Sequence, residues 1–180
     1  MLVIPHRAQR SGSLLPAAQL RRRRVLSKGS WIVAGPVEAE APPSAAPLGY
    51  RIPDDRVMTH AVLDRLQTAS DPKASRALVV QELQAAKATA SAGFEAAFLD
   101  NPRHARALIT AQAALTDVLV QVTLAAAMRL HPLANPTEAE RSAGLGVGGY
   151  GRAEMAPQSD VDLLFLTPWK ITPWAESVIE

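Results

Sequence analysis

The chain has 180 residues, of which 48% are hydrophobic, and this is enough for one modest packed domain. It contains no cysteine, which excludes disulfide bonds, thiolate metal sites and cysteine nucleophiles and is compatible with a reducing cytoplasm. The net charge is only +2, but no Asp or Glu precedes Glu38, whereas 7 of the 19 Lys and Arg residues do. The rest of the chain is therefore acidic, with 12 basic against 17 acidic side chains.

Residues 1 to about 50 are rich in Arg, Ala, Pro and Ser without sustained periodicity, which predicts a disordered tail. The run Arg21 to Arg24 suits contact with nucleic acid or anionic lipid, and the acidic-poor leader resembles an organelle transit peptide. Prolines interrupt the stretch, aromatic residues are scarce and no secretory apolar region follows the arginines. We therefore expect a solvated tail, or a start read too far upstream, and neither a nucleic-acid nor a membrane partner.

A helical region is predicted over residues 56–132. Apolar residues recur at spacings of three and four from Ala74 to Leu99 and again from Arg103 to Leu130, and a shorter helix is expected from Arg56 to Thr68. Asp71-Pro72 is a typical helix start, and Asn101-Pro102 is a typical stop. The two longer helices then form an antiparallel hairpin.

The second long helix is the most apolar of the three. Asp117 and Gln121 interrupt its apolar run, so we expect the run to be too short for a membrane span of about 20 residues. A packed helical support is the simpler interpretation. His104 and His131 flank the helix without metal-ligand spacing, which predicts cap or surface positions for both.

The most specific pattern runs from Leu145 to Leu166, LGVGGYGRAEMAPQSDVDLLFL. Near its start, Gly144 to Val147 has the length and composition of a strand. Gly148 and Gly149 let the backbone approach a ligand without Cβ clashes, and a short helix is expected to begin near Arg152. Exposed N–H groups in such a turn suit a triphosphate. On its own, however, this glycine pattern is often only a tight connection.

The second part of the pattern holds Asp160 and Asp162 at the head of an apolar strand that continues from Leu163 to Leu166. Two strand residues separated by one point to the same face, which puts the carboxylates about 6.5 Å apart along the strand. Mg²⁺ prefers carboxylate and phosphate oxygens, and a pair of such ions can clamp the attacking and leaving oxygens of a phosphoryl displacement. Alone, two such aspartates are usually just a solvated strand edge.

The combination of the two parts is much more specific than either. Apolar-Gly-Gly, ten residues and then Asp-apolar-Asp-apolar matches the signature of the polymerase-β-like nucleotidyltransferases. The intervening residues, G-G-Y-G-R-x-E followed by S-D-x-D-L-L-F-L, closely resemble the bacterial PII uridylyltransferase/uridylyl-removing enzymes. The specific part of this resemblance is about twenty residues long, within a likeness that covers roughly residues 74 to 180.

The resemblance implies a cytoplasmic enzyme of nitrogen regulation that transfers UMP from UTP to a tyrosine hydroxyl of the signalling protein PII and releases pyrophosphate. It implies that Asp160 and Asp162 are catalytic and hold Mg²⁺. The residues expected to contact the nucleotide are Gly148, Gly149, Arg152 and Ser159. An ion pair with Glu154 or a core carboxylate is an equal alternative for Arg152, and capping of the loop is an alternative for Ser159.

Other interpretations stay open. Glutamine synthetase adenylyltransferases are similar around their Ser-Asp-x-Asp but usually lack the Tyr-Gly-Arg that stands here at residues 150–152. A small nucleotidyltransferase with another substrate is a second alternative. A non-catalytic remnant that folds against another chain is a third.

The resemblance also implies parts that this sequence does not hold. They are a third carboxylate on a later strand, an HD phosphohydrolase domain that removes the nucleotide, and glutamine-sensing ACT domains. Glu176 and Glu180 do not match the third carboxylate. We therefore expect an α/β, or more loosely α+β, fragment that is inactive alone: a helical hairpin, then the first strands of a polymerase-β-like nucleotidyltransferase domain over residues 144–180.

Overall fold

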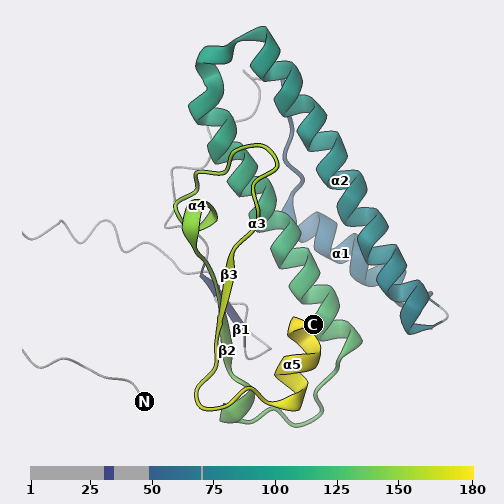
Figure 1. Ribbon diagram of the computed structural model, residues 1–180. Coiled ribbons are helices and arrows are strands. Elements are labelled where there is room, and N and C mark those ends of the chain that lie inside the picture. The colour runs from purple at the N-terminus through teal and green to yellow at the C-terminus, as the bar shows by residue number, and fades with distance from the viewer. Residues whose placement is uncertain (1–30, 35–48, 70) are drawn as a thin grey trace, which may run out of the picture.

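The computed structural model describes residues 31–34, 49–69 and 71–180 of the chain. Its described part is mostly helical, with a small sheet beside the helices (Figure 1). The helices and strands, in chain order, are β1 (Trp31–Ala34), α1 (Asp55–Leu66), α2 (Pro72–Asp100), α3 (Ala105–Leu130), β2 (Ser142–Gly146), α4 (Gly148–Gly151), β3 (Leu163–Leu166) and α5 (Pro173–Ile179). Short 3₁₀ turns lie at Pro102–His104 and Glu138–Glu140.

Local capping explains where the long helices begin and end, and the three predicted helices are confirmed within a few residues. The Asp54 side chain accepts hydrogen bonds from the first turn of α1, and the Asp71 side chain accepts one from the Ala74 N–H at 2.8 Å in α2. Asn101 ends α2 in an extended conformation, and its side chain accepts from the Arg103 N–H. The chain then reverses into α3 and forms the expected hairpin (Figure 1).

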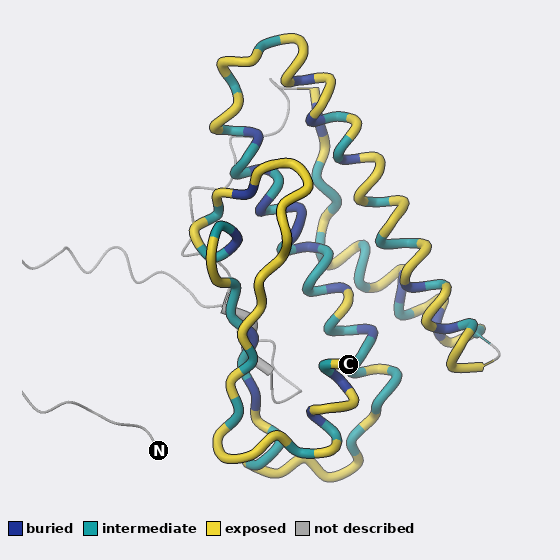
Figure 2. Tube along the Cα trace, in the orientation of Figure 1, coloured by how far each residue is buried: buried dark blue, intermediate teal, exposed yellow. Residues whose placement is uncertain are grey.

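The core of the helical region has two parts, both built on α3. At one end Val62 of α1 and Val79 of α2 pack with Val122 of α3. At the other end the rings of Tyr50 and Phe94 meet edge to face at 4.9 Å, in the same cluster as Leu115. Buried positions therefore recur along the whole of α3 (Figure 2).

The helix Pro102–Leu130 is long and apolar enough to cross a membrane by length and composition, and it is the one such helix among the described residues. The expectation that its apolar run is too short is therefore wrong, because Asp117 and Gln121 leave enough apolar residues on either side. Core helices of packed proteins pass the same test. The packing of α3 against α1 and α2 on one side and α5 on another accounts for its apolar composition.

The sheet has the order β1-β2-β3, with β1 parallel and β3 antiparallel to β2. Gly144 pairs with Val33 on one side and with Phe165 on the other. Tyr50, at the end of the stretch expected to be a disordered tail, is buried, and the four residues of β1 also lie in that stretch, so the expectation is wrong for these residues. Residues 1–30 and 35–48 of the tail lie outside the described residues. Four residues are too few for a periodic signal, and their strand depends on pairing with β2.

The sheet has an inner and an outer face. Phe165 packs in a cluster with Ala175 and Val178 of α5, which rest on the last turns of α3. The Trp174 ring N–H donates to the His131 carbonyl at 2.7 Å and fixes α5 at the end of α3. The neighbours of Phe165 in β3, Leu164 and Leu166, are exposed. The result is a mixed α/β arrangement, as the sequence predicts, in which α3 supports both the hairpin and the sheet.

Candidate functional site

The glycine motif forms the tight turn that leaves β2. Gly148, the first residue of α4, has a φ of 61°, in the left-handed region that favours glycine. A 2.9 Å hydrogen bond from the Gly151 N–H to the Val147 carbonyl closes this short helix. The expectation that a helix begins near Arg152 is wrong, since α4 ends at Gly151 and Arg152 is its C-cap. A Cβ on Gly151 would lie 2.4 Å from the Gly146 carbonyl oxygen, so the early turn depends on glycine there.

The two halves of the motif meet at Gly148 and Asp162. The Val147 N–H donates to the Asp162 carbonyl at 3.0 Å, which extends the pairing of β2 and β3 by one residue. A Cβ on Gly148 would lie 2.7 Å from Asp162 Oδ2, so this carboxylate is directly over the glycine. The expectation of a strand-borne Asp-x-Asp is wrong, because the strand begins at Leu163, three residues after Asp160. Asp160 and Asp162 lie just before it with exposed side chains.

These two carboxylates fit part of a Mg²⁺ site. Their oxygens are of the hard type that Mg²⁺ prefers, and an exposed position leaves room for phosphate oxygens and water in the remaining places. Among the described residues, no group of three or more His, Cys, Asp or Glu side chains is arranged to hold a metal. Asp160 and Asp162 would therefore supply only two of the ligands.

Gly149 is required for packing as well as for any approach of a ligand. A Cβ there would lie 2.9 Å from the Glu154 carbonyl oxygen, and the Glu154 N–H donates back to the Gly149 carbonyl at 2.9 Å. A larger side chain at residue 149 would displace this loop whether or not a phosphate binds. The motif glycines thus have a structural cause that the sequence pattern alone does not separate from a role in binding.

Two other predicted nucleotide contacts, Arg152 and Ser159, take part in local interactions. Arg152 Nε lies 3.4 Å from Glu154 Oε2, the ion-pair alternative raised from the sequence, and both side chains are largely exposed. The Ser159 N–H donates to the Ala156 carbonyl at 3.2 Å and closes a turn in which Gln158 has a φ of 67°. The pair with Glu154 does not prevent Arg152 from contacting a nucleotide, because an exposed ion pair is weak.

A partly buried hydrogen bond that sequence reasoning missed holds the glycine turn to α3. The Tyr150 side chain is only 2% exposed, and its hydroxyl donates to Asp117 Oδ1 at 2.8 Å. Burial raises the pKa of Asp117, and the hydrogen bond from Tyr150 partly opposes this. Burial, with the nearby Asp117 charge, raises the pKa of Tyr150 far above its usual range, so this phenol stays protonated. The signal in the sequence that could have indicated this hydrogen bond was Asp117, an acidic residue inside an apolar helix.

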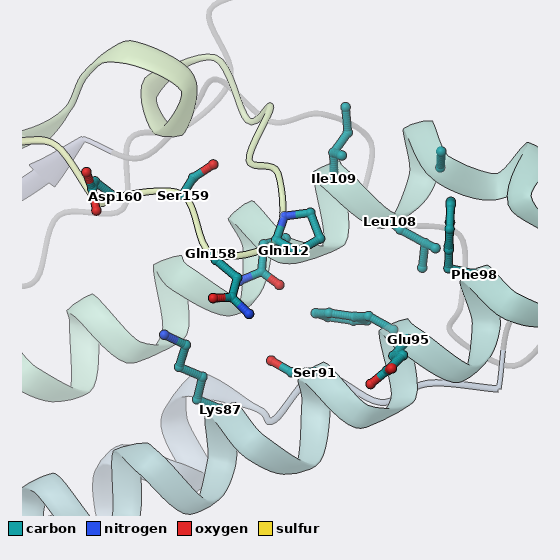
Figure 3. A pocket seen from close by; sticks show the side chains of 13 residues that line it. Lys87, Ser91, Glu95, Phe98, Leu108, Ile109, Gln112, Gln158, Ser159 and Asp160 are labelled. Atoms are coloured by element: carbon teal, nitrogen blue, oxygen red, sulfur yellow. The ribbon is translucent and has the colours of Figure 1, made fainter.

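A cavity of about 770 Å³ lies between the α2–α3 hairpin and the loop that leads to the aspartates. Figure 3 shows Lys87 and Gln158 directed toward the same space, with Asp160 at one end of the lining. The residues around the cavity include Ser159 and Asp160 but not Gly148, Gly149 or Asp162. This cavity is therefore separate from the glycine turn, which lies on a more open surface.

The chain is similar to curated bacterial enzymes that share one name, "bifunctional uridylyltransferase/uridylyl-removing enzyme". It is 56% identical over 152 residues to the enzyme of Cereibacter sphaeroides, in a match that covers 79% of this chain and 16% of the relative. The Ruegeria pomeroyi enzyme is 52% identical, in a match that covers 62% of this chain and 12% of that enzyme. The Rhodospirillum rubrum enzyme is 36% identical, in a match that covers 71% of this chain and 14% of that enzyme. No protein-family model and no solved structure matches the chain.

The similarity extends well beyond a stretch of about twenty residues, since a match over 79% of the chain must include the helical region. The chain spans about one sixth of the length of the Cereibacter relative, and less of the other two. The family resemblance predicted from the motif is confirmed. This chain belongs to the family of bifunctional uridylyltransferase/uridylyl-removing enzymes.

Proposed function

We propose that this segment is part of a cytoplasmic nucleotidyl-transfer site that moves UMP from UTP to a tyrosine of PII and releases pyrophosphate. The observation that carries the proposal is the contact between Gly148 and Asp162, which joins the two halves of the nucleotidyltransferase motif. The names of the relatives support uridylyl transfer. The fold of the site is proposed to be that of the polymerase-β-like nucleotidyltransferases, with neither nucleic acid nor a membrane as partner.

The residues of the segment would act by binding and charge neutralisation. Asp160 and Asp162 would hold Mg²⁺, and the open backbone at Gly148 and Gly149 would lie against the triphosphate. Bound Mg²⁺ supplies charge neutralisation on the phosphate oxygens during an in-line displacement. Arg152 would exchange its exposed pairing with Glu154 for a phosphate contact, and Ser159 would hold the loop that presents Asp160. Catalysis of this kind depends mainly on positioning.

The test uses a chimera, defined as the Cereibacter sphaeroides enzyme in which this chain replaces the matching stretch, which is 16% of the length of that enzyme. The chimera is incubated with PII, Mg²⁺ and UTP or ATP labelled at the α-phosphate, and label on PII is followed by gel. We expect labelling from UTP and not from ATP, and a loss of about 100-fold or more in the Asp160→Asn chimera. Labelling from ATP would favour the adenylyltransferase alternative, and full activity in Asp160→Asn would refute the metal role.

The same assay on the 180-residue chain by itself is expected to give no measurable transfer. Two carboxylates bind Mg²⁺ weakly, and no third acidic side chain joins them within the described residues. A poorly fixed ion misplaces the phosphates, and a shift of about 1 Å costs about 100-fold in rate. Robust labelling by the isolated chain would show that two carboxylates suffice.

A further inference from the structure

Asp117 is in an unfavourable place for a carboxylate. It is half-buried on α3, between the buried Thr116 and Val118, and this burial raises its pKa. Among the described residues its one hydrogen-bond donor is the Tyr150 hydroxyl, and no Lys, Arg or His forms an ion pair with it. An apolar side chain would be less costly to bury at this point of the helix. What the carboxylate provides, and an apolar side chain would not, is therefore an acceptor for the hydrogen bond from the Tyr150 hydroxyl.

Through this hydrogen bond, Tyr150 connects Asp117 to the centre of the glycine turn. Its ring is packed in a cluster with Ala113 of α3 and with Met155, and it lies so close to Gly146 that a Cβ there would be 2.8 Å from a ring carbon. The Met155 N–H also donates to the Ile109 carbonyl of α3 at 3.3 Å. The turn is thus attached to α3 at two points, and only the one at Tyr150 is a side-chain hydrogen bond.

The attachment lies two residues from the point where the motif halves meet. Tyr150 is in the same four-residue helix as Gly148, whose Cα is covered by Asp162 Oδ2. The Asp162 carbonyl is in turn fixed by the Val147 N–H. A movement of the Tyr150 ring would shift α4 and change the position of Gly148 relative to the Asp162 carboxylate. A continuous chain of contacts therefore runs from Asp117 through Tyr150 to Asp162.

We propose that Asp117 and Tyr150 are positioning residues of the nucleotidyl-transfer site, so that α3 helps to fix the geometry of that site. The inference rests on the proposed function. Asp117 fixes the Tyr150 ring, and the ring fixes the glycine turn against the metal-binding carboxylates. Neither side chain has to touch the nucleotide or the metal.

The test compares Tyr150→Phe, Asp117→Leu and Asp117→Asn in the chimera, with Tyr50→Phe as the matched control. Tyr50 is the other tyrosine of the chain and is also buried, but it packs on Phe94 of the hairpin. We measure kcat, and the UTP and Mg²⁺ concentrations that give half the maximal rate. Tyr150→Phe and Asp117→Leu are expected to lower kcat about tenfold and to raise both half-saturating concentrations several-fold. Asp117→Asn keeps an acceptor for the Tyr150 hydroxyl, so its kcat and both half-saturating concentrations should stay close to those of the wild-type chimera.

A purely structural role predicts a different pattern. Fewer folded molecules would lower the rate while both half-saturating concentrations stayed at their wild-type values, and that result in Tyr150→Phe would overturn the proposal. Tyr150→Phe keeps the ring and its packing, so it gives an answer even where Asp117→Leu does not fold. Tyr50→Phe should match the wild-type chimera. The proposed function fails separately, through an inactive wild-type chimera or an active Asp160→Asn variant.

Discussion

At the scale of single residues, Asp117 is the position where stability and site geometry conflict. Its pKa is raised by burial, so the folded protein holds a proton on this carboxylate more readily than the unfolded chain does. The stabilisation that follows is present below the unfolded pKa of about 4 and is lost as pH rises through the folded pKa. At neutral pH the charged Asp117 therefore destabilises the fold.

We predict that Asp117→Asn increases stability at pH 7, that the gain shrinks as pH falls through the raised pKa of the folded Asp117, and that it is lost below about 4. The amide oxygen can still accept the hydrogen bond from Tyr150. Hydrogen exchange of the α3 peptides in the chimera, compared between variants at the same pH, measures the effect. Glu95→Gln, on the exposed side of α2, is the control and should change little. A gain that is equal at pH 7 and pH 3 would contradict the burial argument.

At the scale of elements, the sequence was sufficient for the long helices, because their period and their caps are local properties. Asp71 and Asn101 mark ends that the structure confirms. The predicted start of the short helix near Arg152 was wrong. The true position of α4 depends on how closely Gly151 approaches Gly146, and this contact between backbone atoms leaves no periodic pattern in the sequence. The Tyr150–Asp117 bond joins residues 33 positions apart and appears only once α3 and the turn are packed together.

The glycine turn gives a direct prediction at this scale. Gly151→Ala would place a methyl group 2.4 Å from the Gly146 carbonyl oxygen, where neither backbone segment can yield easily. We expect a local loss of about 1–3 kcal/mol, measured as reduced hydrogen-exchange protection of the peptide that covers β2 and α4. Gly144→Ala is the matched control, because its methyl would meet the Phe165 ring at an ordinary 3.5 Å. Equal protection in the two variants would mean that the turn is looser than its contacts indicate.

At the scale of the whole molecule, α3 connects the features that the sequence presents as separate. It forms one side of the hairpin, supports the sheet through the Phe165 cluster, and holds the glycine turn through Asp117. Asp162 then lies at the surface beside that turn, and the match to the Cereibacter relative covers 16% of the length of that enzyme. The central claim is that this arrangement places Asp162 to bind the metal ion that accompanies UTP.

Binding of Mn²⁺ to the chimera, measured by electron paramagnetic resonance with and without UTP, tests that claim most directly, because it separates metal binding from turnover. The wild-type chimera should bind Mn²⁺ more tightly when UTP is present, and Asp162→Asn should lose this UTP-dependent binding. Glu154→Gln removes another exposed carboxylate of the same loop, one that pairs with Arg152, and should retain it. Equal UTP-dependent Mn²⁺ binding in Asp162→Asn and wild type would contradict the account.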